Sequence, residues 1–223
     1  MNTCVRVLAA SAAAVVFHAA APCTVLVHAD VVFTGSAHLT GAPASVEANV
    51  WESNHRTRVF QEQSGLVLGE DLHVDITAFG RVDDTSDMTP GTIDAGTRVD
   101  SWFVHQDVVG PRGNLFLKGS ITFDQEILGV IVNRESLLNS DGPLGNPGTV
   151  YPLGLFPRGL DFGQDSEKIK VSADRHTLKF NLYTTTVMDQ IRVITAAAPV
   201  PAPAAATLLL GGLLTRGRRR RAE

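Results

Sequence analysis

Acidic side chains gathered in one loop are the residues of this sequence whose type best suits the binding of an ion. Asp83, Asp84, Asp87 and Asp94 lie close together in a stretch that also contains Thr and Gly. Carboxylate oxygens presented by such a loop are ligands that Ca²⁺ prefers. The spacing matches no EF-hand, and a loop that is simply solvated explains the same residues. We therefore expect no obligatory cofactor, with calcium at these four aspartates as the one candidate metal.

One set of residues has the chemical types of a hydrolytic triad without its arrangement. Ser101, His105 and Asp107 follow one another along one predicted strand and its end. A nucleophile, its base and the carboxylate that orients the base must converge on one point, whereas residues along a strand spread over a face. The sequence also contains no Gly-x-Ser-x-Gly, no His-Glu-x-x-His and no phosphate-binding glycine loop. We predict that the protein is not an enzyme.

Two further pairs of polar residues are weaker candidates for chemistry. Asp124 and Glu126 flank a turn, whereas the two carboxylates of a glycosidase come from different elements that face each other across a cleft. His73 and Asp75 are expected on one face of an alternating strand, and two ligands do not complete a metal site. Both pairs are interpreted as solvated polar residues.

Aromatic side chains are the candidates for stacking against a ligand such as a sugar ring, namely Trp102, Tyr151 and Phe156. Tyr151 and Phe156 belong to a long irregular stretch, residues 139–164, that is rich in Pro and Gly. Long loops in compact domains either carry function or fold back over the core. We favour a covering loop, because buried loop hydrophobes need no ligand to explain them. Trp102, like Trp51, lies in a strand pattern where burial is expected.

The elements that must position these residues are mostly short strands, because apolar and polar residues alternate with a period of two. Turn residues separate the alternating runs, and no internal repeat is visible. Such a pattern predicts an all-β fold, an antiparallel β-sandwich of the jelly-roll or Ig-like kind, with one short helix at 134–138. The expected strands are 30–34, 46–51, 58–61, 72–76, 99–105, 115–123, 127–132, 168–172, 178–182 and 191–194.

The same alternation predicts which side chains enter the core. Lysines 168, 170 and 179 should be exposed on the opposite faces of their strands. The residues expected to be buried are Ile169, Val171, Leu178, Phe180, Leu182, Ile191 and Val193.

Residues 30–195 are long enough to form one domain of ordinary size. They contain 13 Lys and Arg against 22 Asp and Glu, a net charge of −9. A protein that binds the phosphate backbone of nucleic acid needs a basic face. A domain as acidic as this one is therefore not expected to bind nucleic acid. Both cysteines, Cys4 and Cys23, precede this domain, which therefore has no disulfide and no thiol chemistry.

The first 29 residues have the order of a secretory signal peptide. Arg6 precedes an apolar, alanine-rich run from Val7 to Val16, and small residues follow. Cleavage is expected after Ala29, with Ala21 as an earlier alternative. This segment predicts export.

Proline-bearing, apolar and basic segments follow the domain in that order. Residues 196–203 form a Pro/Ala linker, 204–215 an apolar segment and 216–223 a basic tail. The apolar segment rises roughly 18 Å as a helix, against about 30 Å of hydrocarbon, which predicts a weak or transient anchor in the inner membrane. Arginines that follow an apolar segment stay on the cytoplasmic side, so the domain faces outward.

This order of segments resembles the PEP-CTERM sorting signal of bacterial proteins. Ala202 stands where the family usually has glutamate. The resemblance implies that an exosortase-type enzyme processes the tail and that the protein reaches the cell surface or the extracellular space. The residues that carry the resemblance are Val200, Pro201 and Pro203 of the motif and the cluster Arg218, Arg219, Arg220 and Arg221.

A second resemblance covers the stretch from Val99 to Thr195. It is similar to a recurring exported domain of uncharacterised bacterial proteins that carry the same kind of tail, and it implies no known activity. The segments that carry this resemblance are 99–105, 119–124, 127–131, 144–149 and 189–195.

Two classes of function remain for the domain. The first is a non-catalytic cell-surface or extracellular-matrix protein that acts through surface contacts. The alternative is a lectin-like carbohydrate-binding module, with or without calcium, whose partner is an extracellular polysaccharide. A solvent-exposed Trp beside Tyr151 in a groove would favour the alternative.

Overall fold

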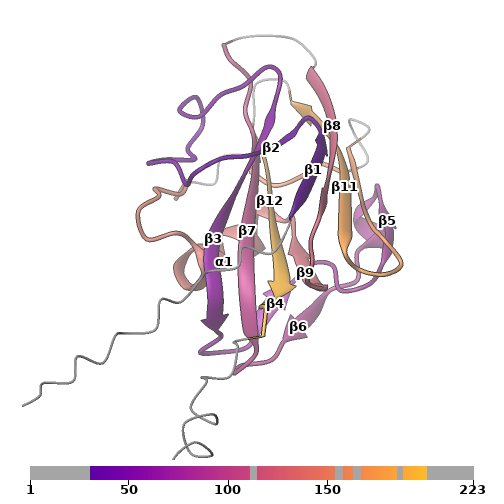
Figure 1. Ribbon diagram of the computed structural model, residues 1–223. Coiled ribbons are helices and arrows are strands. Elements are labelled where there is room, and N and C mark those ends of the chain that lie inside the picture. The colour runs from indigo at the N-terminus through magenta and orange to yellow at the C-terminus, as the bar shows by residue number, and fades with distance from the viewer. Residues whose placement is uncertain (1–30, 111–114, 154–157, 163–166, 185–187, 200–223) are drawn as a thin grey trace, which may run out of the picture.

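The computed structural model describes residues 31–110, 115–153, 158–162, 167–184 and 188–199, which form a mostly β structure (Figure 1). The helical elements in these ranges are the 3₁₀ turn η1 (Thr85–Asp87) and the helix α1 (Arg134–Leu144). The strands are β1 (Val32–Gly35), β2 (Ala37–Leu39), β3 (Thr57–Val67), β4 (Leu72–Val74), β5 (Gly80–Val82), β6 (Gly91–Ile93), β7 (Arg98–Gln106), β8 (Leu115–Thr122), β9 (Ile127–Ile131), β10 (Lys168–Val171), β11 (Thr177–Thr184) and β12 (Asp189–Ala196).

Two five-stranded sheets make up most of this fold, and β4 and β6 pair separately. Sheet A has the order β1-β8-β11-β10-β5, and sheet B has the order β2-β3-β7-β12-β9. Neighbouring strands are antiparallel in both sheets except β2 and β3, which are parallel. The mostly β class and the pairing of strands agree with the predicted sandwich, whereas the parallel pair departs from a purely antiparallel one.

The parallel pair arises where the chain passes from sheet A to sheet B. β1 ends at Gly35, whose φ is +66°, and β2 begins at Ala37 in the other sheet. A Cβ atom at Gly35 would lie 2.4 Å from the carbonyl oxygen of Lys118, so only glycine fits this crossing. The sharp turn directs β2 along β3 in the same direction.

One hydrophobic core lies between the two sheets and contains the residues of β10, β11 and β12 that were predicted to face inward. It includes all seven residues that were expected to be buried. Lys170 and Lys179 are exposed as predicted, and Lys168 is half-buried. The seven residues are Ile169, Val171, Leu178, Phe180, Leu182, Ile191 and Val193.

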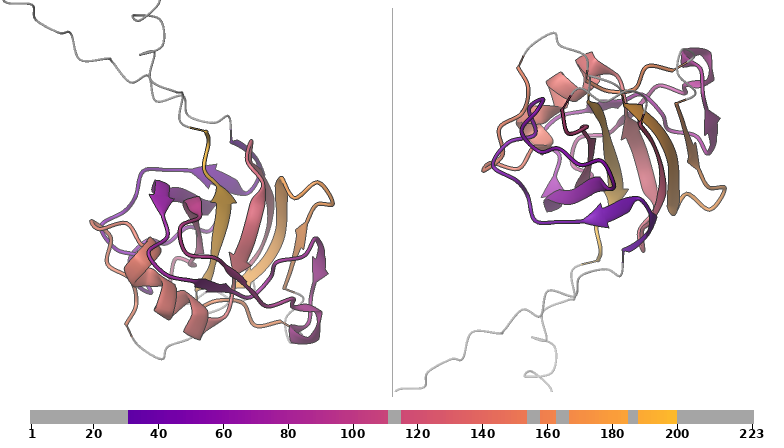
Figure 2. Two further views of the ribbon diagram at one scale, coloured as in Figure 1. Left: turned by 90° about the horizontal axis from the view of Figure 1, so that it is seen from below. Right: turned by 90° about the horizontal axis from the view of Figure 1, so that it is seen from above.

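A second hydrophobic core covers the opposite face of sheet B, which the sequence pattern did not indicate. Phe60, Phe103 and Ile194 of sheet B pack there against residues of β4, β6 and α1. Figure 2, seen roughly along the strands, places α1 on the side of the molecule away from β11. The central strands of sheet B are therefore buried on both faces, and the expectation that β12 is only half-buried is wrong.

Three local predictions change in the structure. The expected strand 46–51 is wrong: only Ser45 forms a bridge, to Val150, and the chain then turns at Asn49, which has a φ of +62°. The helix expected at 134–138 extends to Leu144. The covering role of the long loop is confirmed for Tyr151, which packs in the second core.

Several predicted segments lie outside the described residues. They are the signal peptide 1–29, the apolar segment 204–215 and the basic tail 216–223. In the ranges that the structure does describe, no helix is both long and apolar enough to cross a membrane.

Candidate functional site

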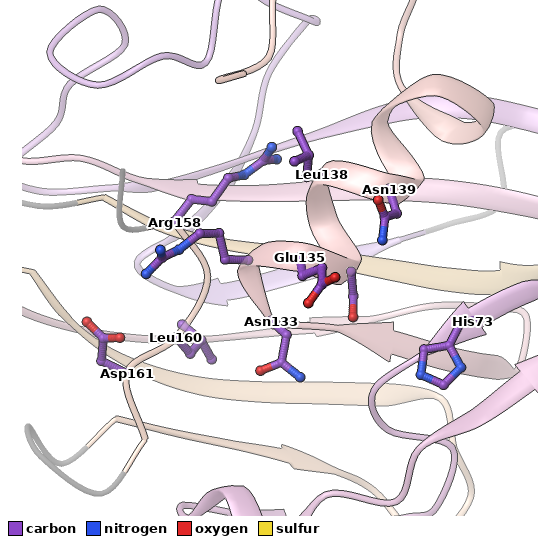
Figure 3. A pocket seen from close by; sticks show the side chains of 10 residues that line it. His73, Asn133, Glu135, Leu138, Asn139, Arg158, Leu160 and Asp161 are labelled. Atoms are coloured by element: carbon purple, nitrogen blue, oxygen red, sulfur yellow. The ribbon is translucent and has the colours of Figure 1, made fainter. Parts of the chain in front are cut away.

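An open, polar groove lies along α1 and is the principal candidate site (Figure 3). Its volume is about 930 Å³, and a neighbouring hollow of about 290 Å³ shares His73, Ser136 and Asn139 with it. His73 comes from β4 and is exposed, whereas the other two residues come from α1. The groove is lined by His73, Asn133, Arg134, Glu135, Ser136, Leu138, Asn139, Arg158, Leu160 and Asp161.

Asp75 fixes the start of α1 beside β4. Its carboxylate is buried and accepts hydrogen bonds from the backbone N–H of Val132 at 2.7 Å and of Asn133 at 2.8 Å. The Asn133 amide at 3.0 Å and the Ser136 hydroxyl at 2.7 Å donate to its other oxygen. A carboxylate at a helix N-terminus satisfies orphan N–H groups and interacts favourably with the helix dipole. The groove wall made by Asn133 and Ser136 is therefore held in place.

Arg158 closes the far side of the groove while its guanidinium is bound inside the protein. It donates to both oxygens of Asp141 in α1, at 2.6 Å and 3.2 Å, and through Nε to Gln190 of β12 at 2.7 Å. A bidentate pair of this kind fixes orientation as well as distance. Arg158 thereby ties the segment that carries Leu160 and Asp161 to the helix.

A second buried arginine lies behind the helix. Arg192 of β12 donates to Glu62 of β3 through Nε at 2.7 Å and Nη2 at 2.8 Å, and to Asp141 at 2.9 Å. The Ser140 hydroxyl and the Leu137 carbonyl accept its Nη1. Burial acts to lower the pKa of Arg192, but the carboxylates of Glu62 and Asp141 outweigh it and raise the pKa. The cluster thus holds two cations, Arg158 and Arg192, against two anions.

Glu62 accepts two further hydrogen bonds in this cluster. The hydroxyls of Tyr151 and Ser101 each donate to it at 2.6 Å. Burial, followed by the negative charge of Glu62, raises the pKa of Tyr151, so its phenol stays protonated. Glu62 and Ser101 are buried as well, and the cluster works as a rigid base for α1 rather than as a solvent-facing site.

The groove can make many hydrogen bonds but offers little ring surface. Asn133, Glu135 and Asn139 are exposed along it, and Asp161 is exposed at its end. Among the described lining residues, His73 is the only aromatic side chain. Amide and carboxylate groups recognise hydroxyl-bearing ligands through directional hydrogen bonds.

The four aspartates of the calcium hypothesis are engaged in local turn contacts. Asp83 pairs with Arg81. Asp84 caps η1, and the Asp87 carboxylate accepts the backbone N–H of Asp84 at 3.2 Å in a capping box. The carbonyl of Asp94 accepts the Thr97 N–H in a separate turn after β6. Within the described ranges, no group of three or more His, Cys, Asp or Glu is placed to hold a metal ion.

The residues of the triad-like set are all buried, and each has a different partner. Ser101 donates to Glu62, the Asp107 carboxylate accepts the Asn49 N–H at 2.7 Å, and His105 contacts Gln190 at 3.3 Å through Nδ1. Burial, followed by the charge of Arg58, lowers the pKa of His105 to about 3. The structure does not bring the three side chains together as nucleophile, base and orienting group.

Of the two polar pairs, Asp124 and Glu126 are both exposed at a bend between β8 and β9, as expected. Glu126 forms an ion pair with Arg175 at 3.3 Å, on the side of a turn. His73 is exposed in the groove whereas Asp75 is buried under α1, so the expected shared face is wrong. The reason is that β4 ends at Val74, and the chain bends before Asp75.

The aromatic candidates occupy the interior rather than the groove. Trp102 is buried between the sheets beside Phe123, and Tyr151 is buried against Phe103. Phe156 lies outside the described residues. Trp51 is half-buried and stacks on His105 with ring centroids 5.5 Å apart. The described aromatics do not form the exposed platform that would favour ring stacking in a groove.

A buried pair of acids was not anticipated from the sequence. Glu167 and Asp189 are both buried, and each carboxyl affects the pKa of the other. Glu167 also accepts the backbone N–H of Asp161 at 2.6 Å, and Asp189 accepts the hydroxyl of Thr184 at 2.9 Å. Burial raises the pKa of both carboxyls, and their mutual repulsion raises that of Asp189 well above its usual range. Through the hydrogen bond from Asp161 to Glu167, the pair supports the Asp161 end of the groove.

Comparisons with family models, curated proteins and solved structures found no match to this chain. The functional interpretation of the groove, and of the cluster behind it, therefore depends on their geometry alone.

Proposed function

We propose that this protein is exported and acts outside the cell by binding, as a non-catalytic surface or extracellular-matrix protein, with the groove along α1 as a contact site for a glycan. The observation that carries the proposal is the groove itself, an open polar surface with walls fixed from behind. Asp75 fixes the start of the helix, and Asp141 fixes its end through Arg158 and Arg192. Preorganised hydrogen-bonding groups reduce the entropy lost when a ligand binds.

A hydroxyl-rich ligand suits this groove better than an apolar one. The side chains of Asn133, Asn139, Glu135 and Asp161 offer both donors and acceptors, as sugar hydroxyls require. Little apolar ring surface is exposed there, so affinity would come from several weak polar contacts. A matrix or adhesive protein can use such weak sites when many copies act together.

The route to the outside is part of the same proposal. We assign residues 1–29 to a signal peptide and residues 196–223 to a PEP-CTERM-like tail that an exosortase-type enzyme removes after transient anchoring in the inner membrane. The order of prolines, apolar residues and arginines supports this assignment. We also assign the two packed five-stranded sheets to a jelly-roll or Ig-like sandwich, and we expect no nucleic-acid partner.

A glycan array with the purified protein, run with calcium and again with a chelator, tests the binding function. We expect binding of one or more neutral glycans that is weakened at least about fivefold, roughly 1 kcal/mol, by His73→Ala and by Asn139→Ala. His55→Ala is the matched control, because His55 is exposed and lies outside the groove. Equal binding by all three variants would remove the groove from the proposal. Hydrolysis of a glycan, abolished by one carboxylate substitution, would contradict the non-catalytic assignment.

A further inference from the structure

All four lysines of the chain lie on the outer face of sheet A. Lys118 belongs to β8, Lys179 to β11, and Lys168 and Lys170 to β10. Arg81 of β5 joins them, because it is directly opposite Lys170 in the strand register. We call these five residues the lysine face. Figure 1 shows that β8, β11 and β5, three of the strands that carry them, lie on one side of the molecule.

The strand register places these cations in rows across the sheet. Arg81 is opposite Lys170, and Lys170 is opposite Lys179. Neighbouring strands lie about 4.8 Å apart, so three positive charges stand side by side. Like charges directly opposite each other in a sheet are destabilising, and the fold tolerates this arrangement at a cost. A surface on which positive and negative charges alternate would be sufficient for solubility and would avoid this cost.

A second row repeats the pattern along the strands. Asn181 is opposite Lys118 on one side and opposite Lys168 on the other. The two rows are two residues apart on each strand, which is about 7 Å. The lysine face therefore has two rows of positive charge, and in the second row the buried Asn181 lies between the two lysines.

The sheet supplies no acidic residue to neutralise these charges. The five strands of sheet A contain no Asp or Glu, although acidic residues outnumber basic ones in the domain. Asp83, which pairs with Arg81, lies beyond the end of β5. The lysines of an acidic domain are thus collected on one face whose strands carry no carboxylate, and this face attracts anions.

The rest of the outer face suits a sugar chain. Thr34 and Ser120, whose hydroxyls are hydrogen-bonded at 2.7 Å, continue the row of Lys179 toward β1. At one end of the face, Phe116 and Tyr183 pack with ring centroids 4.4 Å apart, and Phe116 is 50% exposed. Hydroxyls and partly exposed rings are the groups that contact sugar hydroxyls and pyranose faces.

We propose that the lysine face binds an acidic polysaccharide, one whose sugars carry carboxylates. Lysine ammonium groups pair with carboxylates as point charges, and the hydroxyls of Thr34 and Ser120 bind the sugar hydroxyls. Phosphate polymers are less suited, because the face has no arginine fork except Arg81, which is already paired, and the domain as a whole is acidic. The inference rests on the proposed extracellular role but uses a surface separate from the groove along α1.

Binding of polygalacturonate by the full-length protein tests this site, with neutral dextran as the uncharged comparison. The variant Lys170→Gln/Lys179→Gln should bind polygalacturonate at least about tenfold more weakly than the wild type. Arg56→Gln is the control, because it removes an exposed cation that directly precedes β3 and lies outside the lysine face. It should change binding by less than about twofold. Wild-type binding should weaken strongly between about 0.1 M and about 1 M salt, because exposed charges are screened.

Folding of the variants is checked separately by thermal unfolding. Because the substitutions relieve the opposition of Lys170 and Lys179, the melting temperature should stay the same or rise, so lost binding cannot be attributed to unfolding. Unchanged polygalacturonate binding by the double variant, or equal binding of dextran, would overturn the proposal. Equal or tighter binding of double-stranded DNA or of phosphatidylglycerol vesicles would overturn the assigned partner.

The same binding measurements distinguish the lysine face from the groove along α1. His73→Ala should leave polygalacturonate binding unchanged, and the lysine variant should leave neutral-glycan binding unchanged. Cleavage of polygalacturonate by a protein whose binding still depends on Lys170 and Lys179 would contradict the non-catalytic role while supporting the lysine face.

Discussion

Arg192 reaches Glu62 across an intervening strand. The two residues belong to β12 and β3, which are separated in sheet B by β7. The guanidinium lies 5.2 Å from the centre of the Phe103 ring of β7 and forms two hydrogen bonds, at 2.7 Å and 2.8 Å, with the carboxylate beyond it. A side chain that bridges three strands fixes their relative positions and, through Asp141, the position of α1.

Replacing Arg192 with Met should lower the free energy of unfolding by about 3–5 kcal/mol, because Glu62 would be left buried without a counter-charge, whereas Asp141 keeps its pair with Arg158. Urea unfolding measures the change. Arg81→Met is the control, since the exposed pair of Arg81 with Asp83 contributes at most about 1 kcal/mol. In a double-mutant cycle, Glu62→Gln combined with Arg192→Met should cost less than the sum of the single changes. A loss below about 1 kcal/mol for Arg192→Met would contradict the role of the cluster.

Stability should fall as the pH is lowered, in part because of His105. The pKa of His105 is about 3 in the folded protein, below its ordinary value of 6.5. The unfolded chain therefore binds a proton that the folded protein does not, so stability decreases from about pH 6.5 down to about pH 3. The contribution reaches up to about 4 kcal/mol. Denaturant midpoints over this range should show a smaller fall for His105→Asn than for the wild type; parallel curves would contradict the assignment.

The acid pair predicts the opposite dependence on pH. The pKa of Asp189 is raised in the folded protein, so its contribution is complete below the ordinary carboxyl pKa and is lost as the pH rises. Asp189→Asn should therefore stabilise the protein near pH 8 and have little effect near pH 4, because the neutral amide has no buried charge for Glu167 to repel. Urea unfolding at the two pH values measures this. Thr184→Val is a useful comparison: it removes the hydroxyl that donates to Asp189, so it should destabilise the protein at both values.

Processing of the tail is the fourth prediction. Mass spectrometry of protein recovered from outside the cell should show that the segment containing Arg218 to Arg221 has been removed. Pro201→Ala combined with Pro203→Ala should leave that segment attached, because the motif would be lost. Pro199→Ala, which lies outside the motif, should be processed normally. An intact arginine cluster on wild-type protein released from cells would contradict the proposal.

The alternation of β10 and β11 was sufficient to predict the core between the sheets. Side chains of a strand point to alternate sides at every residue. Once one face is known to be buried, Ile169 and Phe180 are assigned to the core. The pattern also placed α1 directly after β9, although it gave too short a helix. In contrast, the strand expected at 46–51 failed because Asn49 adopts a left-handed conformation, which apolar content alone does not reveal.

The second core and the ionic cluster could not be predicted, because they depend on elements brought together from distant parts of the chain. Arg192 stands between Ile191 and Val193 like any outward-facing polar residue. It is buried because α1 and the Tyr151 loop cover that face. One signal was available: Ile194 follows Val193 without a polar residue between them, as in a strand buried on both sides. The partners, Glu62 and Asp141, carried no comparable signal.

The central position of β12 in sheet B has a consequence for the order of folding during the export that we propose. β12 is the last strand of the described chain, yet it lies between β7 and β9 and supplies the guanidinium that joins Glu62 to Asp141. A chain that emerges from a translocation channel N-terminus first cannot close this sheet until residue 196 has passed. Contacts of such long sequence separation also form slowly. For the export that we propose, this order means that sheet B, and with it the native state, is completed only after β12 has left the channel.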